Sequence, residues 1–315
     1  MNREKNKITI HIGFHKTATT SYQKSIFPNL ENVEFLGRNW KGVSESASLY
    51  QEICEYCFNS NSNSNSNSDE RNYERINAKL ADLLETKSIL ISDEWFLSDY
   101  SGFYGVKSCP WQMKLRKLAK LLSNFEHEVI VFIRSPLDCL FSQYCEFKTV
   151  GLPDALKSFN RYLNSNDAKA YDYCELERYL NTIFQSVNFV TFETLISYPV
   201  SKLYLEREVL NVKILKSELE HTNNKVVNNN KVQVKVVKKG FFAKFYDSYI
   251  SHNLRRKLKK IKFLGDIKNY LYSNKSSIVT VPLDEKKIPV EMERMFSNAE
   301  AFYQGKLDYE RKFEI

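Results

Sequence analysis

The sequence predicts an α/β fold in which a central, mostly parallel sheet is flanked by helices in three layers. Short apolar segments alternate with longer segments of helical periodicity, as repeated βαβ units require. The segment EVIVFIR, residues 128–134, is apolar at nearly every position, which favours a strand buried on both faces. With 315 residues, 43% of them hydrophobic, the chain is long enough to bury such a core.

The first elements follow from local patterns. Residues 7–13, KITIHIG, alternate and are rich in Ile and Thr, which indicates a strand. A turn and a helix over residues 19–27 are expected next, with Thr17 as the N-cap. Residues 33–37 predict a second short strand, and residues 44–58 predict a helix.

The same alternation continues along the chain. The pattern predicts strands at 88–92 (SILIS) and 188–192 (NFVTF) in addition to 128–134. Pro136 suits the first turn of a helix that follows the strand at 128–134. The helices expected in this part of the chain are 70–84, 113–123, 137–150, 153–163, 172–185 and one from Ser201.

Two segments depart from this pattern. Residues 59–68 repeat Asn-Ser five times and have no apolar content, which predicts a flexible surface insertion. Residues 225–262 hold twelve Lys or Arg and one acidic residue. The chain has a net charge of +8, and all of its excess positive charge lies in this segment. Such a block implies an anionic partner, or else a solvated basic helix. We expect a core over residues 1–220 and a basic, helical extension of the same domain over 221–315, facing the acceptor or a membrane.

Cysteine usage and the N-terminal segment bear on location. The first thirteen residues pass into a strand and not into the apolar stretch of a secretory signal, so a cytoplasmic protein is expected. Six cysteines in a chain of this length predict free thiols. Cys54 and Cys57 form a CxxC pair without a second pair to complete four ligands, so no metal site is expected.

The loop after the first strand carries the clearest chemical signal. In IHIGFHKTATTSYQ, residues 10–23, a glycine and a polar loop lead into a helix start crowded with hydroxyls, a junction that can bind phosphate. A nucleotide-hydrolysing P-loop places its lysine six residues after its first glycine, whereas Lys16 follows Gly13 by three. ATP or GTP hydrolysis is therefore disfavoured.

This loop resembles the 5'-phosphosulfate-binding loop of sulfotransferases that use 3'-phosphoadenylyl sulfate (PAPS), especially bacterial members acting on carbohydrates. The resemblance implies a P-loop-like fold and a loop that wraps the 5'-phosphosulfate. Ala18 stands where many members have glycine, and alanine tolerates positive φ poorly. The residues implied as donor-binding are His15, Lys16, Thr17, Ala18, Thr19, Thr20 and Ser21.

A second element of the resemblance concerns the 3'-phosphate. The family pairs an arginine after a strand with a serine eight residues later, around R-x-P. Arg134, Pro136 and Ser142 in FIRSPLDCLFSQY match this pattern. A lone arginine at a strand end is more often part of a structural ion pair, but the order of the two motifs favours donor binding.

Sulfuryl transfer needs leaving-group stabilisation and a base. Lys16 fits the first role because its ammonium can stabilise charge on the leaving oxygen, with no metal required. Glu94, at the end of the strand SILIS, is the best-placed base, with Asp93 as an alternative. The competing reading is that Glu94 only caps the next helix.

The sequence therefore predicts a PAPS-dependent sulfotransferase that acts on a hydroxyl or amine of a carbohydrate or lipid-linked glycan. The alternatives are a nucleotide kinase or NTPase with a degenerate loop, and a nucleic-acid-binding protein built on residues 225–262. We expect no nucleic-acid partner, and the basic block allows peripheral contact with an acidic inner membrane face.

Overall fold

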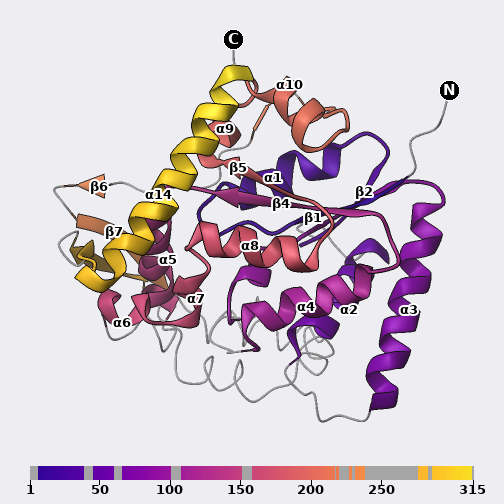
Figure 1. Ribbon diagram of the computed structural model, residues 1–315, viewed down its shortest axis with the longest axis horizontal. Helices are drawn as coiled ribbons and strands as arrows, with labels where there is room; N and C mark the ends of the chain where they lie inside the picture. The colour runs from indigo at the N-terminus through magenta and orange to yellow at the C-terminus, as the bar shows by residue number, and fades with distance from the viewer. Residues whose placement is uncertain are drawn as a thin grey trace.

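The chain folds into three layers, with a parallel sheet between two sets of helices (Figure 1). This computed structural model describes residues 6–38, 45–59, 66–100, 108–150, 158–216, 218–219, 227–228, 231–237, 276–282 and 286–313. The predicted fold class is confirmed.

The central sheet has five strands in the order β2-β3-β1-β4-β5, and every neighbouring pair is parallel. β1 lies in the middle, where Ile10 pairs with Ile91 on one side and with Val129 on the other. Because all strands run the same way, their carboxyl ends meet at one edge. The strands are β1 Ile8–His11, β2 Val33–Gly37, β3 Ser88–Ser92, β4 His127–Ile133 and β5 Val187–Thr191.

Helices cover both faces of this sheet (Figure 1). One face packs against α2 Glu45–Phe58, α3 Ser66–Leu84, α4 Trp111–Leu122, α5 Pro136–Val150, α8 Tyr173–Ile183 and α14 Val290–Glu310. The other packs against α1 Thr19–Ser25, α9 Phe192–Ile196 and α10 Lys202–Tyr204. Short helices α6 Phe159–Leu163 and α7 Asn166–Lys169 follow α5.

The side chains of β4 show why this strand was the strongest signal in the sequence. Val129, Val131 and Ile133 belong to the cluster on one face, while Ile130 and Phe132 belong to the cluster on the other. A strand that is buried on both faces needs apolar residues at consecutive positions, which is the pattern that the sequence shows.

Two sequence-based expectations differ from the structure. The Asn-Ser segment is not wholly an insertion, because α3 begins at Ser66; residues 60–65 lie outside the described part. The expected helical extension contains a three-stranded antiparallel sheet of β6 Val227–Asn228, β7 Lys231–Val237 and β8 Ser276–Pro282, with β7 against α5. KVQVKVV alternates with β-branched valines, which favours a strand. α14 is helical as expected, and residues 238–275, with most of the basic block, are not described.

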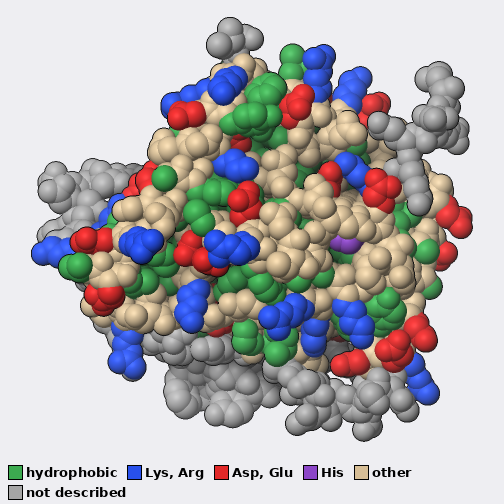
Figure 2. All heavy atoms as spheres, in the orientation of Figure 1, with side chains coloured by type: hydrophobic (Ala, Val, Ile, Leu, Met, Phe, Trp, Pro, Cys, Tyr) green, Lys and Arg blue, Asp and Glu red, His purple; other side chains and the backbone are tan. Residues whose placement is uncertain are grey.

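Basic and acidic side chains are interspersed over the face shown in Figure 2. This mixture agrees with the near balance of charge outside residues 225–262. Within the described ranges, no helix has both the length and the apolar character needed to span a bilayer.

Candidate active site

The carboxyl edge of the sheet gathers polar residues from four neighbouring strands. The loop of residues 12–18 follows β1, and Arg38 follows β2 directly. Asp93 and Glu94 follow β3, and Arg134 follows β4. Ligands of open α/β sheets bind at this edge, so the strand directions alone bring these residues to one candidate site.

The loop after β1 turns through two residues in the left-handed region. Lys16 has φ 71° and Ala18 has φ 63°. Such a conformation costs a non-glycine residue roughly 1–2 kcal/mol. Ala18 occupies the N-cap position of α1, and its carbonyl accepts from the backbone N–H of Ser21 at 2.9 Å. The prediction that Thr17 caps this helix is therefore wrong. The loop adopts its left-handed turn at position 18 even though the residue there is alanine and not glycine.

Contacts with neighbouring elements hold the loop in this shape. The backbone N–H of Phe14 donates to Phe132 on β4 at 3.3 Å, and Cys139 Sγ donates to the His15 carbonyl at 3.3 Å. Thr17 is fully buried, and its hydroxyl donates to the Phe14 carbonyl at 2.6 Å. Thr19 is also buried, so these two hydroxyls shape the loop from within.

α1 is shorter than the sequence predicts. It spans Thr19–Ser25, seven residues, and a 3₁₀ turn over Phe27–Asn29 follows it. A helix of two turns has a weak macrodipole. An anion at this junction would therefore depend on loop N–H groups and on the Lys16 side chain.

Gly13 is required by a close approach between β1 and α1. A Cβ at this position would lie 2.6 Å from Thr19 Oγ1 and 2.8 Å from His11 Nε2, and both residues are buried. We expect Gly13→Ala to lower the free energy of unfolding by about 1–3 kcal/mol, as overpacking does. Urea unfolding would measure it. The matched control is Gly305→Ala, where a Cβ meets nothing within 4 Å. Equal stability of the two variants would contradict this account of the loop.

Lys16 points toward α5, where its Nζ lies 2.9 Å from Glu146 Oε2. Ser142 precedes Glu146 by four residues on the same helix, so both lie on one face of α5. The structure thus brings Lys16 and Ser142, two residues predicted from separate motifs, to the same helix face. Glu146 was not predicted, because nothing local in the sequence pairs it with a lysine 130 residues earlier.

His15 packs between aromatic rings at the same edge. Its ring centroid lies 4.5 Å from that of Trp95 and 5.4 Å from that of Phe147, both edge-on. Burial lowers the pKa of His15 to about 4, although the nearby carboxylate of Glu146 acts in the opposite direction. The imidazole is therefore neutral at pH 7.

Glu94 is buried, and each of its carboxylate oxygens has a partner. Arg38 Nη1 lies 2.9 Å from Oε1, and Gln23 Nε2 donates to Oε2 at 3.3 Å. The capping role belongs to its neighbour, since Asp93 Oδ1 accepts from the Trp95 backbone N–H at 2.9 Å. Glu94 is therefore not the cap of the turn that follows β3.

Asp93 is buried beside Glu94 and has several polar partners. Tyr50 donates its hydroxyl to Asp93 Oδ2 at 2.5 Å, and Arg38 Nη2 lies 3.5 Å from Oδ1. Burial raises the pKa of Asp93, while the Arg38 guanidinium opposes that shift. Arg38 itself keeps a raised pKa, because Asp93 and Glu94 together outweigh the effect of its burial.

A buried lysine supports the segment that carries Glu94. Lys114 on α4 donates to the carbonyls of Trp95 at 3.1 Å, Ser98 at 2.6 Å and Tyr100 at 2.5 Å. Burial lowers the pKa of Lys114 to about 8, so the ammonium remains largely charged at pH 7. These three bonds fix the chain directly after β3 and with it the position of Glu94.

Arg134 lies on the other side of β1. Its guanidinium carbon is 4.8 Å from the ring centroid of Phe192, and its carbonyl accepts from the Tyr173 hydroxyl at 2.7 Å. Glu193, beside Phe192, accepts a hydrogen bond from Tyr303 on α14. Stacking on an aromatic ring leaves a guanidinium's N–H groups directed sideways, as planar recognition of a phosphate requires.

The cysteines do not assemble a metal centre within the described ranges. Cys54 and Cys57 are free thiols on α2, and Cys54 Sγ donates to Asp93 Oδ2 at 3.7 Å. No group of three or more His, Cys, Asp or Glu with the arrangement of a metal site occurs among these residues.

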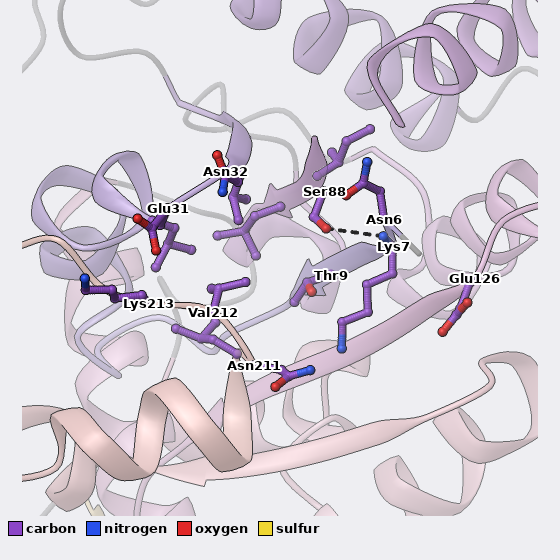
Figure 3. A pocket seen from close by; sticks show the side chains of 15 residues that line it. Asn6, Lys7, Thr9, Glu31, Asn32, Ser88, Glu126, Asn211, Val212 and Lys213 are labelled. Atoms are coloured by element: carbon purple, nitrogen blue, oxygen red, sulfur yellow. Dashed lines mark hydrogen bonds between the residues drawn. The ribbon is translucent and has the colours of Figure 1, made fainter. Parts of the chain in front are cut away.

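A polar pocket of about 440 Å³ lies at the opposite, amino edge of the sheet (Figure 3). Its lining includes Lys7, just before β1, and Ser88, at the start of β3; the Lys7 backbone N–H donates to Ser88 Oγ at 3.3 Å. Asn32 and Asn211 line the same pocket. Its lining includes neither the loop after β1 nor the residues that follow β2, β3 and β4, so this pocket is separate from the candidate active site.

Sequence reasoning missed two residues that contact Glu94. Arg38 directly follows a predicted strand, so the strand-end rule that found Glu94 and Arg134 applied to it as well. Gln23 carried no such signal, because a glutamine in a helix is most often a surface residue. Here Gln23 is 1% exposed.

A scan of protein-family models and a search of curated proteins gave no match. Among solved structures, the chain resembles a sulfotransferase from Alicyclobacillus acidocaldarius over 70% of its own length and 87% of that chain. The sequence identity is 12% and the TM-score is 0.40. Similarity at this level leaves the question of function to the residues of the site.

Proposed function

We propose that this protein is a sulfotransferase that moves a sulfuryl group from PAPS to a hydroxyl or amine of a carbohydrate or lipid-linked glycan. The observation that supports it most is that Lys16, Glu94 and Arg134 follow three neighbouring strands, β1, β3 and β4, at one edge of the sheet. Each of these residues comes from a different motif, and strand order alone makes them neighbours. A lone P-loop-like turn would support the proposal far less.

The two cations fit a donor with charged groups at both ends. Lys16 and the N–H groups of its loop would hold the 5'-phosphosulfate, with Thr20 at the start of α1 beside them. Arg134, stacked on Phe192, and Ser142 on α5 would hold the 3'-phosphate. The donor supplies an activated sulfate whose S–O bond to the 5'-phosphate breaks during transfer.

The reaction is an in-line displacement in which the protein orients and stabilises charge. Glu94 takes the proton of the acceptor hydroxyl while the hydroxyl oxygen bonds to sulfur. The Lys16 ammonium stabilises the charge that grows on the departing phosphate oxygen. To do so it exchanges its contact with Glu146 for a contact with the donor.

Binding of adenosine 3',5'-bisphosphate, the desulfated donor, is the direct test. We expect micromolar affinity by calorimetry without magnesium, and weaker binding by Arg134→Ala. ATP with magnesium is the matched comparison, because a kinase or NTPase prefers it. Preference for ATP with magnesium, or no binding of the bisphosphate, would overturn the proposal.

The role of the basic block belongs to the same proposal. Its twelve cationic residues fit an acidic membrane surface, and the segment lies mostly outside the described part of the chain. Affinity for nucleic acid that falls steeply with salt and that is unchanged in Lys16→Ala would instead favour nucleic acid as the partner.

A further inference from the structure

Of the nine buried side-chain atoms that lack a hydrogen-bond partner in the described part of the chain, four belong to residues that contact Glu94 or lie next to it. Among the described residues, His15 Nε2, Gln23 Oε1, Arg38 Nη2 and Trp95 Nε1 are all in this condition. Gln23 and Trp95 are 1% and 3% exposed. Gln23 and Arg38 contact Glu94 directly, Trp95 follows it in the chain, and His15 packs against Trp95.

The orientation of the Gln23 amide is fixed by its neighbours. Its Nε2 donates to Glu94 Oε2 at 3.3 Å and to Ser92 Oγ at 3.0 Å. A flipped amide would set its carbonyl against the Glu94 carboxylate, so the free atom is the acceptor Oε1. Arg38 Nη2 is within 3.5 Å of Asp93 Oδ1 but makes no hydrogen bond there, so an N–H donor remains.

Such atoms are unusual in folded proteins. Nearly all buried polar groups have a partner, and each unpaired one costs about 1–3 kcal/mol. Two of them, on Gln23 and Arg38, belong to side chains that contact the Glu94 carboxylate, and two more lie on Trp95 and on His15, which packs against it. Such a group indicates that a bound molecule normally supplies the partners. This arrangement has the features of a recognition site, where analogues that lack the matching groups are rejected.

The unpaired atoms specify the chemistry of that molecule. Arg38 and Trp95 can only donate, whereas Gln23 Oε1 can only accept. A sulfate or phosphate group offers no proton to Gln23, and an ammonium offers no acceptor to Arg38. Hydroxyl groups do both. We infer that Gln23, Arg38 and Trp95 recognise the acceptor beside Glu94, and that this acceptor is a neutral, polyhydroxylated molecule. This inference rests on the proposed function.

The charges around this subsite agree with a neutral ligand. Arg38 already faces two carboxyl groups, those of Asp93 and Glu94. A further carboxylate or sulfate would add to this acidic side, and His15 is uncharged at pH 7 because burial lowers its pKa to about 4. One hydroxyl of the acceptor donates to Glu94 and reacts, while its neighbours pair with Gln23 and Arg38.

Saturation-transfer NMR on the full chain with bound adenosine 3',5'-bisphosphate tests this inference. The probes are methyl glucoside, glucosamine, glucuronate and 4-nitrophenol. We expect methyl glucoside to give the strongest transfer, and Gln23→Met to weaken its binding roughly tenfold, which is the loss of one good hydrogen bond. Arg38→Lys keeps the charge and loses the planar donor, so it should also weaken binding.

Gln112→Met on α4 is the matched control, because Gln112 is half-buried and its Nε2 donates to Asn166 Oδ1 at 3.2 Å. It should leave glucoside binding unchanged. No signal from methyl glucoside on the wild-type chain, a stronger signal from a charged or phenolic probe, or undiminished binding by Gln23→Met overturns the inference. Titration of the bisphosphate in the same samples separates this failure from a failure of the proposed function, in which the bisphosphate itself does not bind.

Discussion

Replacing Glu94 with glutamine is expected to lower sulfuryl transfer roughly 10²–10⁴-fold, the usual contribution of a general base. Glutamine has the same shape and still offers an oxygen to Arg38 Nη1, which lies 2.9 Å from Glu94 Oε1, but it cannot take a proton. Affinity for adenosine 3',5'-bisphosphate should stay within a factor of about two, because Glu94 lies on the acceptor side of β1. Transfer of label from PAPS to glycan fractions measures the turnover.

Glu128→Gln is the matched control for this variant. Glu128 is likewise a carboxylate held in an ion pair, with Oε2 2.7 Å from Lys7 Nζ, and it lies near the amino edge of the sheet. Its loss should change stability and leave turnover intact. Near-normal turnover by Glu94→Gln would show that another group, such as Asp93, takes the proton.

Replacing Lys16 with alanine is expected to lower turnover roughly 10²–10³-fold, as removal of one charge-stabilising donor does. The reason is that the ammonium is needed most when charge develops on the leaving phosphate oxygen. Donor affinity should fall less than turnover does, because the loop N–H groups remain. The measurement compares label transfer with calorimetric binding of the desulfated donor.

Lys7→Ala provides a close match for Lys16→Ala. Lys7 is 23% exposed and 2.7 Å from Glu128, while Lys16 is 17% exposed and 2.9 Å from Glu146. Both substitutions therefore leave one partly buried carboxylate without its cation. If the two variants lost the same activity, the loss would come from the unpaired carboxylate and not from the chemistry of Lys16.

The sequence predicted the architecture well because burial imposes a strong pattern. Strands such as β4, which contact helices on both faces, must be apolar at consecutive positions, and that pattern is visible without a structure. Parallel pairing then placed Lys16, Glu94 and Arg134 at one edge. Their positions followed from strand ends alone.

Features set by long-range contacts could not be read in the same way. The left-handed turn at Ala18 depends on partners such as Phe132 and Cys139, more than a hundred residues away, so the N-cap was misassigned. The Glu146 partner of Lys16 was missed for the same reason. β7 was misread because the helical spacing of apolar residues further along the basic block outweighed the short alternation of its valines.

Because β1 is the central strand, the residues of the candidate site fall into two groups, one on each side of it. Residues from β2 and β3, Arg38 and Glu94, lie on one side of it, and Arg134 from β4 lies on the other. In the proposed sulfotransferase, substitutions of the residues after β2 and β3 would change the acceptor, while Lys16 and Arg134, which hold the donor, stay the same. Acceptor specificity and donor binding could therefore evolve separately within one fold.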